Sequence, residues 1–331
     1  MTPRLLRLAS AAVAAALLLT GCGSSGADEP DGSGETRTFT DDRGEVEIPV
    51  DPQRVVATGY AVPVLIQSEA PLVGISTWER GVEFMSPEDL TVYEETEKIS
   101  GDVAAEMNYE AVAKAKPDLI VIGVPQPVLK DVDVDRLEDI APVVTIGPSL
   151  PDKWRVFAEQ QADAAGATEG FDATKKAYEE KAAELSEKYA DLLADAKFGH
   201  LGGYNDVSAG EFHREFAGSW GTNIATDIGV NYYGEVKEKL GGSEDVSEYP
   251  SIEELPQSFA EAEYITYTVQ PDGTPSEGVQ YVLDSPLWAQ LPAVQAGKAI
   301  PIKYTEASTF KDAQKTLDEI DKAFEPYLAQ A

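Results

Sequence analysis

Apolar and polar residues repeat with helical spacing over one long stretch near the middle of the chain. In residues 171–196 the apolar positions recur at steps of three and four, and most positions between them are Lys, Glu or Asp. Such spacing gives a helix one apolar face and one charged face, so it predicts a single amphipathic helix. Asp172 is the expected N-cap, and Gly199 is the expected C-terminal stop. At 1.5 Å per residue the helix would be about 39 Å long, which favours a rigid strut between two lobes over a surface helix or a short coiled coil.

Short apolar runs alternate with helical patterns before this stretch. Residues 36–40 and 45–50 predict a hairpin, because they flank the turn residues Asp42, Arg43 and Gly44. Runs typical of strands follow at 54–57, 71–76, 118–123 and 142–147, with a helical pattern at 108–116. This alternation predicts an α/β fold in which helices cover a parallel sheet. Such folds bind ligands in the loops that follow the carboxyl ends of the strands.

A similar order of patterns follows the long helix. Residues 198–204 are expected to form a strand, 220–229 a helix, 251–269 a helix followed by a strand, and 307–328 a closing helix. The stretch 251–269 repeats the helix-then-strand order of residues 108–123. This internal similarity predicts two lobes of related build.

The first residues have the pattern of an export signal. Arg4 and Arg7 precede an apolar run at 8–19 that is too short to span a bilayer as a folded helix, and Cys22 follows it. Cys22 is the only cysteine, so no internal disulfide is possible. Residues 22–36 have the Gly- and Ser-rich composition of a flexible tether. Removal of residues 1–21, which hold two arginines and no acid, would change the formal net charge from −33 to −35 and argues against nucleic-acid binding.

Several strings resemble one known family in their order and spacing. DDRGEVEIPVDPQRVV, PLVGIS, NYEAVAKAKPDLIVIG and APVVTIG precede the long helix, and DSPLWAQLPAVQAGKAIPIK follows it. Together they resemble the substrate-binding lipoproteins of ABC importers for ferric siderophores, haem and cobalamin. The string LLTGC, which ends at Cys22, resembles the bacterial lipobox, in which the cysteine carries a lipid after cleavage.

The resemblance implies two Rossmann-like α/β lobes that are joined by one long rigid helix and enclose a ligand cleft. The implied protein is a monomer, held by a lipid on the outer face of the cytoplasmic membrane, that captures a ferric siderophore and delivers it to an ABC permease. The implied organisation is a signal peptide at 1–21, a tether at 22–36 with lipidated Cys22, an N-terminal lobe at 37–170, the interlobe helix at 171–197 and a C-terminal lobe at 198–331.

Motifs typical of several enzyme classes are missing from the sequence. It contains no P-loop, HExxH, CxxC or GxSxG pattern. His200 and His213 are the only histidines, too few for the usual preformed site for bare zinc or manganese. We therefore expect no cofactor and no metal bound directly by the protein, because a siderophore would hold the iron. The alternative function, from another class of protein, is that of an exported α/β hydrolase or a siderophore-processing enzyme. Such an enzyme would need a nucleophile–base pair in the cleft.

Aromatic and Arg side chains gather in the loops expected beside the cleft. A ferric chelate presents apolar methylenes and a compact shell of oxygens, which suit aromatic walls and the forked donors of Arg. In the siderophore-binding proteins that this sequence resembles, an aromatic residue and an Arg that follow the first strand of the second lobe often contact the chelate. Acids flank Arg80 and Arg214, so surface ion pairs are the alternative role for both. The candidate ligand-binding residues are Trp78, Arg80, Tyr204, Phe212, His213, Arg214, Trp220, Tyr267 and Tyr304.

The small number of basic residues in these loops ranks the possible ligands. A tris-catecholate iron complex is highly anionic and would call for a cluster of Lys and Arg. The candidate loops offer little beyond Arg80 and Arg214. A neutral or cationic hydroxamate chelate of the ferrioxamine type is therefore the hypothesis, with haem or cobalamin as the alternative within the same fold.

Exposed carboxylates are the expected contacts with the permease. In the family, a Glu within the motif found here as NYEAV commonly meets permease arginines, which points to Glu110. Asp227 is a less clear counterpart in the second lobe. A first-turn acid at Glu110 would also complement the helix dipole, and the two roles can coexist.

Overall fold

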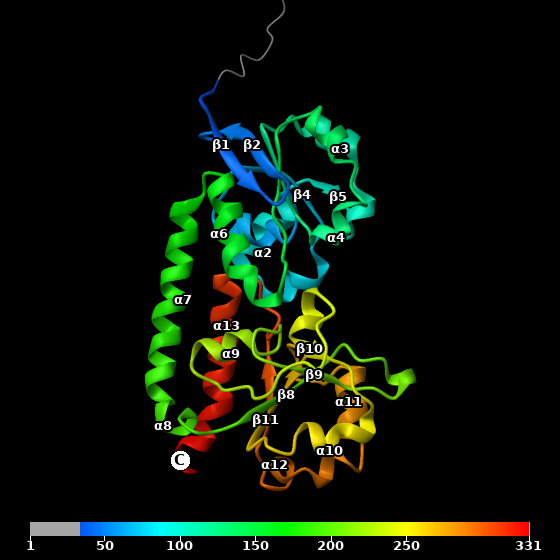
Figure 1. The fold of residues 1–331 in the computed structure, drawn as a ribbon. Coiled ribbons are helices and arrows are strands. Elements are labelled where there is room, and N and C mark those ends of the chain that lie inside the picture. Colours follow the sequence, from blue (N-terminus) through cyan, green and yellow to red (C-terminus); the bar gives the residue numbers. More distant parts are fainter. Residues whose placement is uncertain (1–33, 331) are drawn as a thin grey trace, which may run out of the picture. The chain divides into compact units, whose positions relative to one another are not determined.

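Two five-stranded sheets lie at the centres of two lobes in the computed structural model, which describes residues 34–330 (Figure 1). One lobe precedes the long helix and the other follows it, so the predicted two-lobed α/β fold is confirmed. The expected signal peptide and Cys22 lie outside the described residues. Within residues 34–330, no helix combines the length and the apolar character that a membrane crossing requires.

The sheet of the N-terminal lobe is entirely parallel, with the strand order β5-β4-β3-β6-β7. Parallel strands that are covered on both faces have nearly continuous apolar sequences, and every residue of β6 is buried. β5 has only three residues, with one buried apolar side chain, so no apolar run predicted it. The strands are β3 (Val55–Gly59), β4 (Leu72–Ser76), β5 (Lys98–Ser100), β6 (Leu119–Gly123) and β7 (Val143–Thr145).

A hairpin of β1 (Thr36–Asp41) and β2 (Gly44–Pro49) packs on this lobe, as the sequence predicts. The Asp41 carboxylate accepts hydrogen bonds from the Thr145 backbone N–H at 2.8 Å and from the Thr145 hydroxyl at 2.9 Å. The Asp42 backbone N–H donates to the Thr145 carbonyl at 3.0 Å. These bonds hold the hairpin against the end of β7.

Side-chain caps set the starts of two helices that cover this sheet. Ser86 Oγ accepts from the Asp89 N–H at 3.2 Å at the start of α2, and Asn108 Oδ1 accepts from the Ala111 N–H at 3.1 Å at the start of α3. The helices of the lobe are α1 (Ala61–Gln67), α2 (Pro87–Glu95), α3 (Tyr109–Ala115), α4 (Gln126–Leu129), α5 (Val134–Glu138) and α6 (Trp154–Ala164).

The long helix begins earlier and ends earlier than its pattern predicts. α7 (Thr168–Lys188) has 21 residues, so it is about 32 Å long. The predicted N-cap was wrong, since Asp172 lies inside α7, and the predicted stop was wrong, since Gly199 lies in a strand. The backbone leaves helical geometry at Tyr189, with φ −104° and ψ 8°, and the short helix α8 (Ala190–Leu193) follows.

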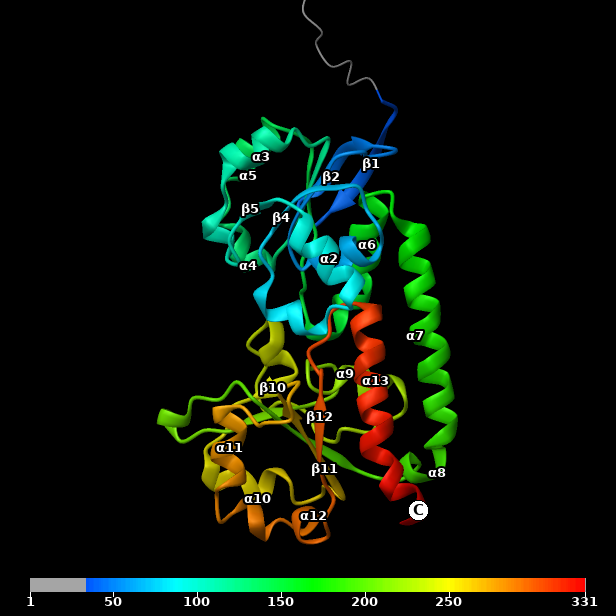
Figure 2. The ribbon, with the colours of Figure 1, turned by 180° about the vertical axis from the view of Figure 1, so that it is seen from behind.

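α7 runs along both lobes, and the last helix, α13 (Phe310–Phe324), lies beside it, as Figures 1 and 2 both show. The Tyr189 hydroxyl donates to the Asp321 carboxylate of α13 at 2.7 Å, which holds the chain at the end of α7. The first turn of α13 contacts the N-terminal lobe, where Gln67 Nε2 donates to Asp312 Oδ1 at 2.9 Å. The two helices therefore connect the lobes in parallel.

The sheet of the C-terminal lobe is mixed. In the order β10-β9-β8-β11-β12, the last three strands are parallel and the first two are antiparallel to their neighbours. Residues 213–215, predicted to lie in a ligand-binding loop, form one of these antiparallel strands. The strands are β8 (Phe198–Gly202), β9 (His213–Glu215), β10 (Ser247–Glu248), β11 (Tyr264–Val269) and β12 (Ala299–Lys303).

Short helices cover this second sheet. The helix expected at 220–229 is shorter than predicted, and the closing helix expected at 307–328 is α13 followed by a 3₁₀ helix, Glu325–Gln330. The other helices of the lobe are α9 (Asn223–Asp227), α10 (Leu255–Ser258), α11 (Glu277–Leu283) and α12 (Pro292–Gln295).

An aromatic cluster joins the helices that connect the lobes. The Phe310 ring of α13 has its centroid 4.8 Å from Trp154, 5.5 Å from Phe171 and 5.4 Å from Tyr178. All four side chains are buried, and they belong to one continuous apolar core with residues of both lobes. Tilted and edge-on rings at these distances attract one another in addition to removing apolar surface from water.

Replacement of Phe310 by Ala should destabilise the protein by about 3–5 kcal/mol, because it opens a cavity within this cluster. Chemical denaturation of the wild type and the variant would measure the change. Leu240→Ala is the control, since Leu240 is 66% exposed and its loss should change the free energy of unfolding by less than about 0.5 kcal/mol. Equal stability of Phe310→Ala and wild type would contradict the importance of the cluster.

Candidate functional site

A cavity of about 370 Å³, which we call the main cavity, lies between the two lobes. Its walls come from segments that follow the carboxyl ends of parallel strands in both sheets, where α/β folds bind ligands. In the N-terminal lobe, Tyr60 follows β3, and Trp78 and Arg80 follow β4. In the C-terminal lobe, Tyr204 follows β8 and Glu306 follows β12.

Aromatic side chains form much of the wall on the N-terminal side. The Tyr60 ring contacts the Trp78 ring edge-on at 4.9 Å and lies parallel to the Trp220 ring of the other lobe at 6.0 Å. Behind the Tyr60 and Trp220 pair, a second cavity of about 660 Å³ shares both residues as lining. The aromatic pair therefore stands between two adjoining spaces in the cleft.

The Arg80 guanidinium lies over these rings. Its central carbon is 4.7 Å from the Trp78 ring centroid and 5.9 Å from that of Tyr60. A cation over aromatic faces is held by the ring quadrupoles, and its N–H donors stay free at its edge. The one ion pair of Arg80 in the described part of the chain is a long contact of 3.5 Å with Asp102, and its side chain is 54% exposed. The surface ion pair considered for Arg80 therefore exists but leaves about half of the side chain exposed.

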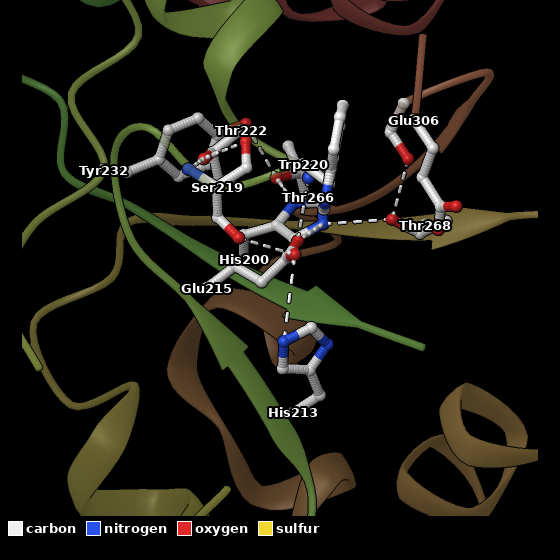
Figure 3. A network of polar contacts seen from close by, with 12 residues as sticks. His200, His213, Glu215, Ser219, Trp220, Thr222, Tyr232, Thr266, Thr268 and Glu306 are labelled. Atoms are coloured by element: carbon white, nitrogen blue, oxygen red, sulfur yellow. Dashed lines mark hydrogen bonds and ion pairs between the residues drawn. The ribbon is translucent and has the colours of Figure 1, made fainter. Parts of the chain in front are cut away.

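A buried carboxylate organises the opposite wall (Figure 3). Glu215 accepts hydrogen bonds from the Ser219 hydroxyl at 2.8 Å and from the Gly221 N–H at 3.0 Å, and His200 Nε2 lies 3.2 Å from it. Only glycine fits at position 221, because a Cβ there would lie 2.0 Å from Glu215 Oε2. The bonds fix the loop that carries Trp220, so the aromatic wall depends on this carboxylate.

The contacts of Glu215 also set its charge. Burial alone would raise the pKa of the Glu215 carboxyl, but the neighbouring imidazoles and the Ser219 hydroxyl outweigh burial and lower that pKa to about 2. Burial lowers the pKa of His213, which favours its neutral imidazole at pH 7. His213 Nε2 is buried, lies 3.8 Å from Glu215 and has no hydrogen-bond partner among the described residues.

This network does not have the arrangement of a hydrolase. In a catalytic triad the histidine contacts the serine and the carboxylate orients the histidine. Here the carboxylate of Glu215 lies between them, because Ser219 and His200 both contact it. Ser219 and His200 are 1% and 0% exposed, so neither can reach a substrate without rearrangement. His200 therefore has a structural role in this network.

Two further carboxylates line the main cavity. Glu306 accepts a hydrogen bond from the Tyr204 hydroxyl. Partial desolvation within the cleft raises the pKa of Glu306, and the nearby charge of Glu215 raises it further. Asp312 lies in the first turn of α13 and is 4% exposed. Arg80 is therefore the one Lys or Arg among the described lining residues, and it faces three acids.

Five of the nine predicted ligand-binding residues line the main cavity: Trp78, Arg80, Tyr204, His213 and Trp220. Tyr304 lies beside them, in a smaller adjoining cavity of about 210 Å³ that we call the side cavity. Contact of these residues with a ligand stays a prediction.

The other three predicted residues, Phe212, Arg214 and Tyr267, do not line the main cavity. Successive residues of a strand point to opposite faces of the sheet. His213 and Glu215 of β9 face the cavity, so Phe212 and Arg214 face the opposite core. Phe212 is fully buried there, and Arg214 pairs with Glu248 at 3.5 Å and packs over Phe216 and Tyr233.

Tyr267 is excluded from the cavity for the same reason. Its neighbours on β11, Thr266 and Thr268, lie within 2.7 and 3.1 Å of the His200 ring nitrogens on the face toward the cavity. The Tyr267 ring lies on the other face, edge-on to Trp288 at 6.1 Å. Trp288 is 6% exposed and belongs to the apolar core on that face.

Several lining residues were not predicted from the sequence. Glu306 follows a strand-like run, so its position at a strand end was a usable signal, as it was for Tyr60. Glu215 and Tyr249 had no such signal, because they reach the cavity through the antiparallel strands β9 and β10, whose polar sequences are typical of loops. Phe84 comes from a 3₁₀ helix, Glu79–Phe84, after β4.

The two predicted docking carboxylates have different surroundings. Glu110 is exposed in the first turn of α3, and no ion pair involves it in the described part of the chain. Asp227, at the end of α9, pairs with Arg155 and accepts a hydrogen bond from the Tyr178 hydroxyl. These contacts tie Asp227 to α6 and α7, so much of its charge is already compensated within the protein.

Two α/β lobes around an aromatic-walled cleft define a two-lobed solute-binding protein. The sequence profile of the periplasmic binding protein family matches residues 55–304, which is most of the chain. This chain belongs to the periplasmic binding protein family, so it is a binding protein and not an enzyme, and the hydrolase alternative is set aside.

Individual relatives agree with this assignment. The iron(3+)-hydroxamate-binding protein YxeB of Bacillus subtilis is 27% identical over 274 residues, which cover 82% of this chain and 79% of that protein. The siderophore periplasmic binding protein from the fuscachelin gene cluster of Thermobifida fusca has 28% identity and a TM-score of 0.65, over 83% of this chain and 97% of that chain. Staphylococcus aureus SirA, solved with staphyloferrin B, shares the fold at 20% identity and a TM-score of 0.66, over 88% of this chain and 99% of that chain.

The buried Asp312 should make stability depend on pH. Burial raises its pKa to about 7, above the ordinary value of 3.8, so the folded state keeps a proton that the unfolded state has lost. Stability should therefore fall as pH rises from about 4 to about 7, by at most about 4 kcal/mol. Asp312→Asn keeps the acceptor for Gln67 and should remove this fall, whereas the exposed Asp139→Asn should retain it. Denaturant titrations at pH 4.5 and 7.5 measure the difference, and an unchanged fall in Asp312→Asn would contradict the assignment.

Proposed function

We propose that this protein binds a ferric hydroxamate siderophore in the main cavity and delivers it to an ABC permease. The observation that carries the proposal is the wall itself: aromatic side chains enclose a space that contains one accessible guanidinium. Aromatic faces suit the methylenes of the chelate, and the forked N–H donors of Arg80 suit the oxygens clustered around iron. The Bacillus relative is named as an iron(3+)-hydroxamate-binding protein, and the Thermobifida relative is named as a siderophore periplasmic binding protein. Both names support the same class of ligand.

The charge of the cavity favours a hydroxamate over a catecholate. A trihydroxamate complex of iron(III) is neutral around the metal, whereas a tris-catecholate complex is strongly anionic. Glu215 and Glu306 line the cavity as carboxylates, and Arg80 is the one Lys or Arg among the described lining residues. In a partly desolvated cleft, like charges brought together cost several kcal/mol, so the carboxylates disfavour an anionic ligand.

The placement of the protein in the cell is part of the same proposal. Cys22 would carry a lipid after removal of residues 1–21, and residues 22–36 would tether the lobes at the outer face of the cytoplasmic membrane. The lobes at 37–170 and 198–331, with the interlobe helix at 171–197, would act as a monomer. Glu110, with Asp227 as its counterpart, would contact the permease. The composition of the tether and the position of the only cysteine support this arrangement.

Removal of the Arg80 charge should weaken chelate binding. We expect Arg80→Gln to raise the Kd for ferrioxamine B about tenfold or more, because hydrogen bonds from a charged donor contribute roughly 1.5–3 kcal/mol. Arg214→Gln is a matched control, since Arg214 lies on the opposite face of the sheet and should leave the Kd unchanged. Quenching of Trp78 and Trp220 fluorescence reports binding in titrations with ferrioxamine B, a ferric tris-catecholate, haem and cobalamin. Tighter binding of the catecholate, haem or cobalamin would overturn the hydroxamate assignment.

Reversal of the Glu110 charge should impair delivery of the chelate to the permease without impairing chelate binding. Glu110→Arg should reduce uptake of iron-55 ferrioxamine B by cells several-fold, because it places a like charge opposite the permease arginines, while the Kd of the purified protein stays unchanged. Glu179→Arg makes the same change at an exposed position on α7 and should leave uptake intact. Normal uptake by Glu110→Arg would refute the docking role.

A further inference from the structure

The side cavity adjoins the main cavity. Arg80, Phe84, Tyr204 and Glu306 line both spaces, so these four side chains lie at the boundary between them. Two of the four come from each lobe. An arm of a ligand whose iron core occupies the main cavity would pass Tyr204 and Glu306 to reach the side cavity, which has a volume of about 210 Å³.

The lining of the side cavity is polar and acidic. Thr268, Gln270, Ser276 and Thr305 supply hydroxyl and amide groups. The charged lining groups are Arg80, Glu83 and Glu306. Of these, Arg80 already directs its guanidinium toward Asp102 and the aromatic rings.

Neither carboxylate of the side cavity has a cationic partner. Among the described residues, no Lys, Arg or His nitrogen lies within 4.0 Å of Glu83 or Glu306. The polar contact of Glu306 is the hydrogen bond that it accepts from the Tyr204 hydroxyl. Both carboxylates are accessible to solvent from the cleft, so a ligand can reach them. An unpaired carboxylate in a confined space gains from a cation, because water screens the pair less there than at an open surface.

We propose that the side cavity binds a protonated amine at the end of an arm of the ferric hydroxamate, with Glu306 as its ion-pair partner and Glu83 adding to the negative potential. This inference rests on the proposed function and narrows it to a cationic chelate. The ammonium would donate to the Glu306 carboxylate and to hydroxyl or amide oxygens such as those of Thr268 and Gln270, so each of its N–H bonds would have an acceptor. Glu306 would then be a residue that determines specificity, whereas Arg80 and the aromatic wall would bind the iron core.

Two chelates with the same iron core test the inference on the wild-type protein. Ferrioxamine B carries a terminal ammonium, and an analogue with a hydroxyl in place of the amine is neutral and of similar size. Fluorescence titration should give a Kd about tenfold lower for ferrioxamine B, in keeping with a partly enclosed ion pair. Equal Kd values for the two chelates would overturn the inference and leave the proposed function intact. Failure of both chelates to bind would instead refute the proposed function.

Single substitutions identify the residue that causes the preference for the cationic chelate. Glu306→Gln should bring the two Kd values within about twofold of each other, because it removes the charge and keeps the shape. Glu83→Gln should reduce the preference less. Glu187→Gln removes the same net charge on the exposed side of α7 and should keep the full preference for the cationic chelate. This variant controls for long-range attraction between the acidic protein and the cationic chelate. An equal loss of affinity for both chelates in Glu306→Gln would assign Glu306 a structural role and overturn the inference.

Discussion

The packing of α7 and α13 across both lobes is the constraint on which the cleft depends. The Phe310 ring lies among aromatic rings from α6 and α7, and this cluster belongs to a core that continues into both lobes. Hydrogen bonds add to it, since Trp154 Nε1 donates to Asn223 Oδ1 at 2.9 Å. A helical connection with a buried core bends less than a loop hinge, so we expect only small lobe closure. The aromatic walls of the main cavity are then largely in place before a ligand arrives, which lowers the entropy cost of binding.

The cavity walls show how the same residue type serves different purposes in different surroundings. Glu215 is buried under hydrogen bonds from Ser219 and Gly221, so its charge is compensated and it holds the Trp220 loop in place. Glu306 is accessible and has no cationic partner among the described residues, so its charge is directed at whatever enters the cleft. Arg80 and Arg214 differ in the same way, because one lies over the cavity rings and the other over the opposite core. Burial and partners, more than residue type, decide which charges face the ligand.

The strongly periodic elements were the ones that the sequence predicted well. β6 is a run of five buried residues, and the Asn108 cap precedes the regular pattern of α3, so local information is sufficient for both. The ends of α7 were predicted less well, because Asp172 has the composition of a cap but the helix had already begun at Thr168. Helix ends depend on which competing backbone contacts form in three dimensions, and those contacts do not follow from composition.

The sequence by itself determined the two-lobed α/β class, the acidic character of the chain and the group of residues that follow the parallel strands, because each depends on local pattern or on composition. Trp78 and Tyr204 could be placed near a cleft for that reason. Only the tertiary structure decided that His213 faces the cavity while Arg214, one residue later, faces the opposite core. The reason is that β9 joins the sheet antiparallel to β8 through contacts between distant segments, and the strand geometry then assigns neighbouring side chains to opposite faces.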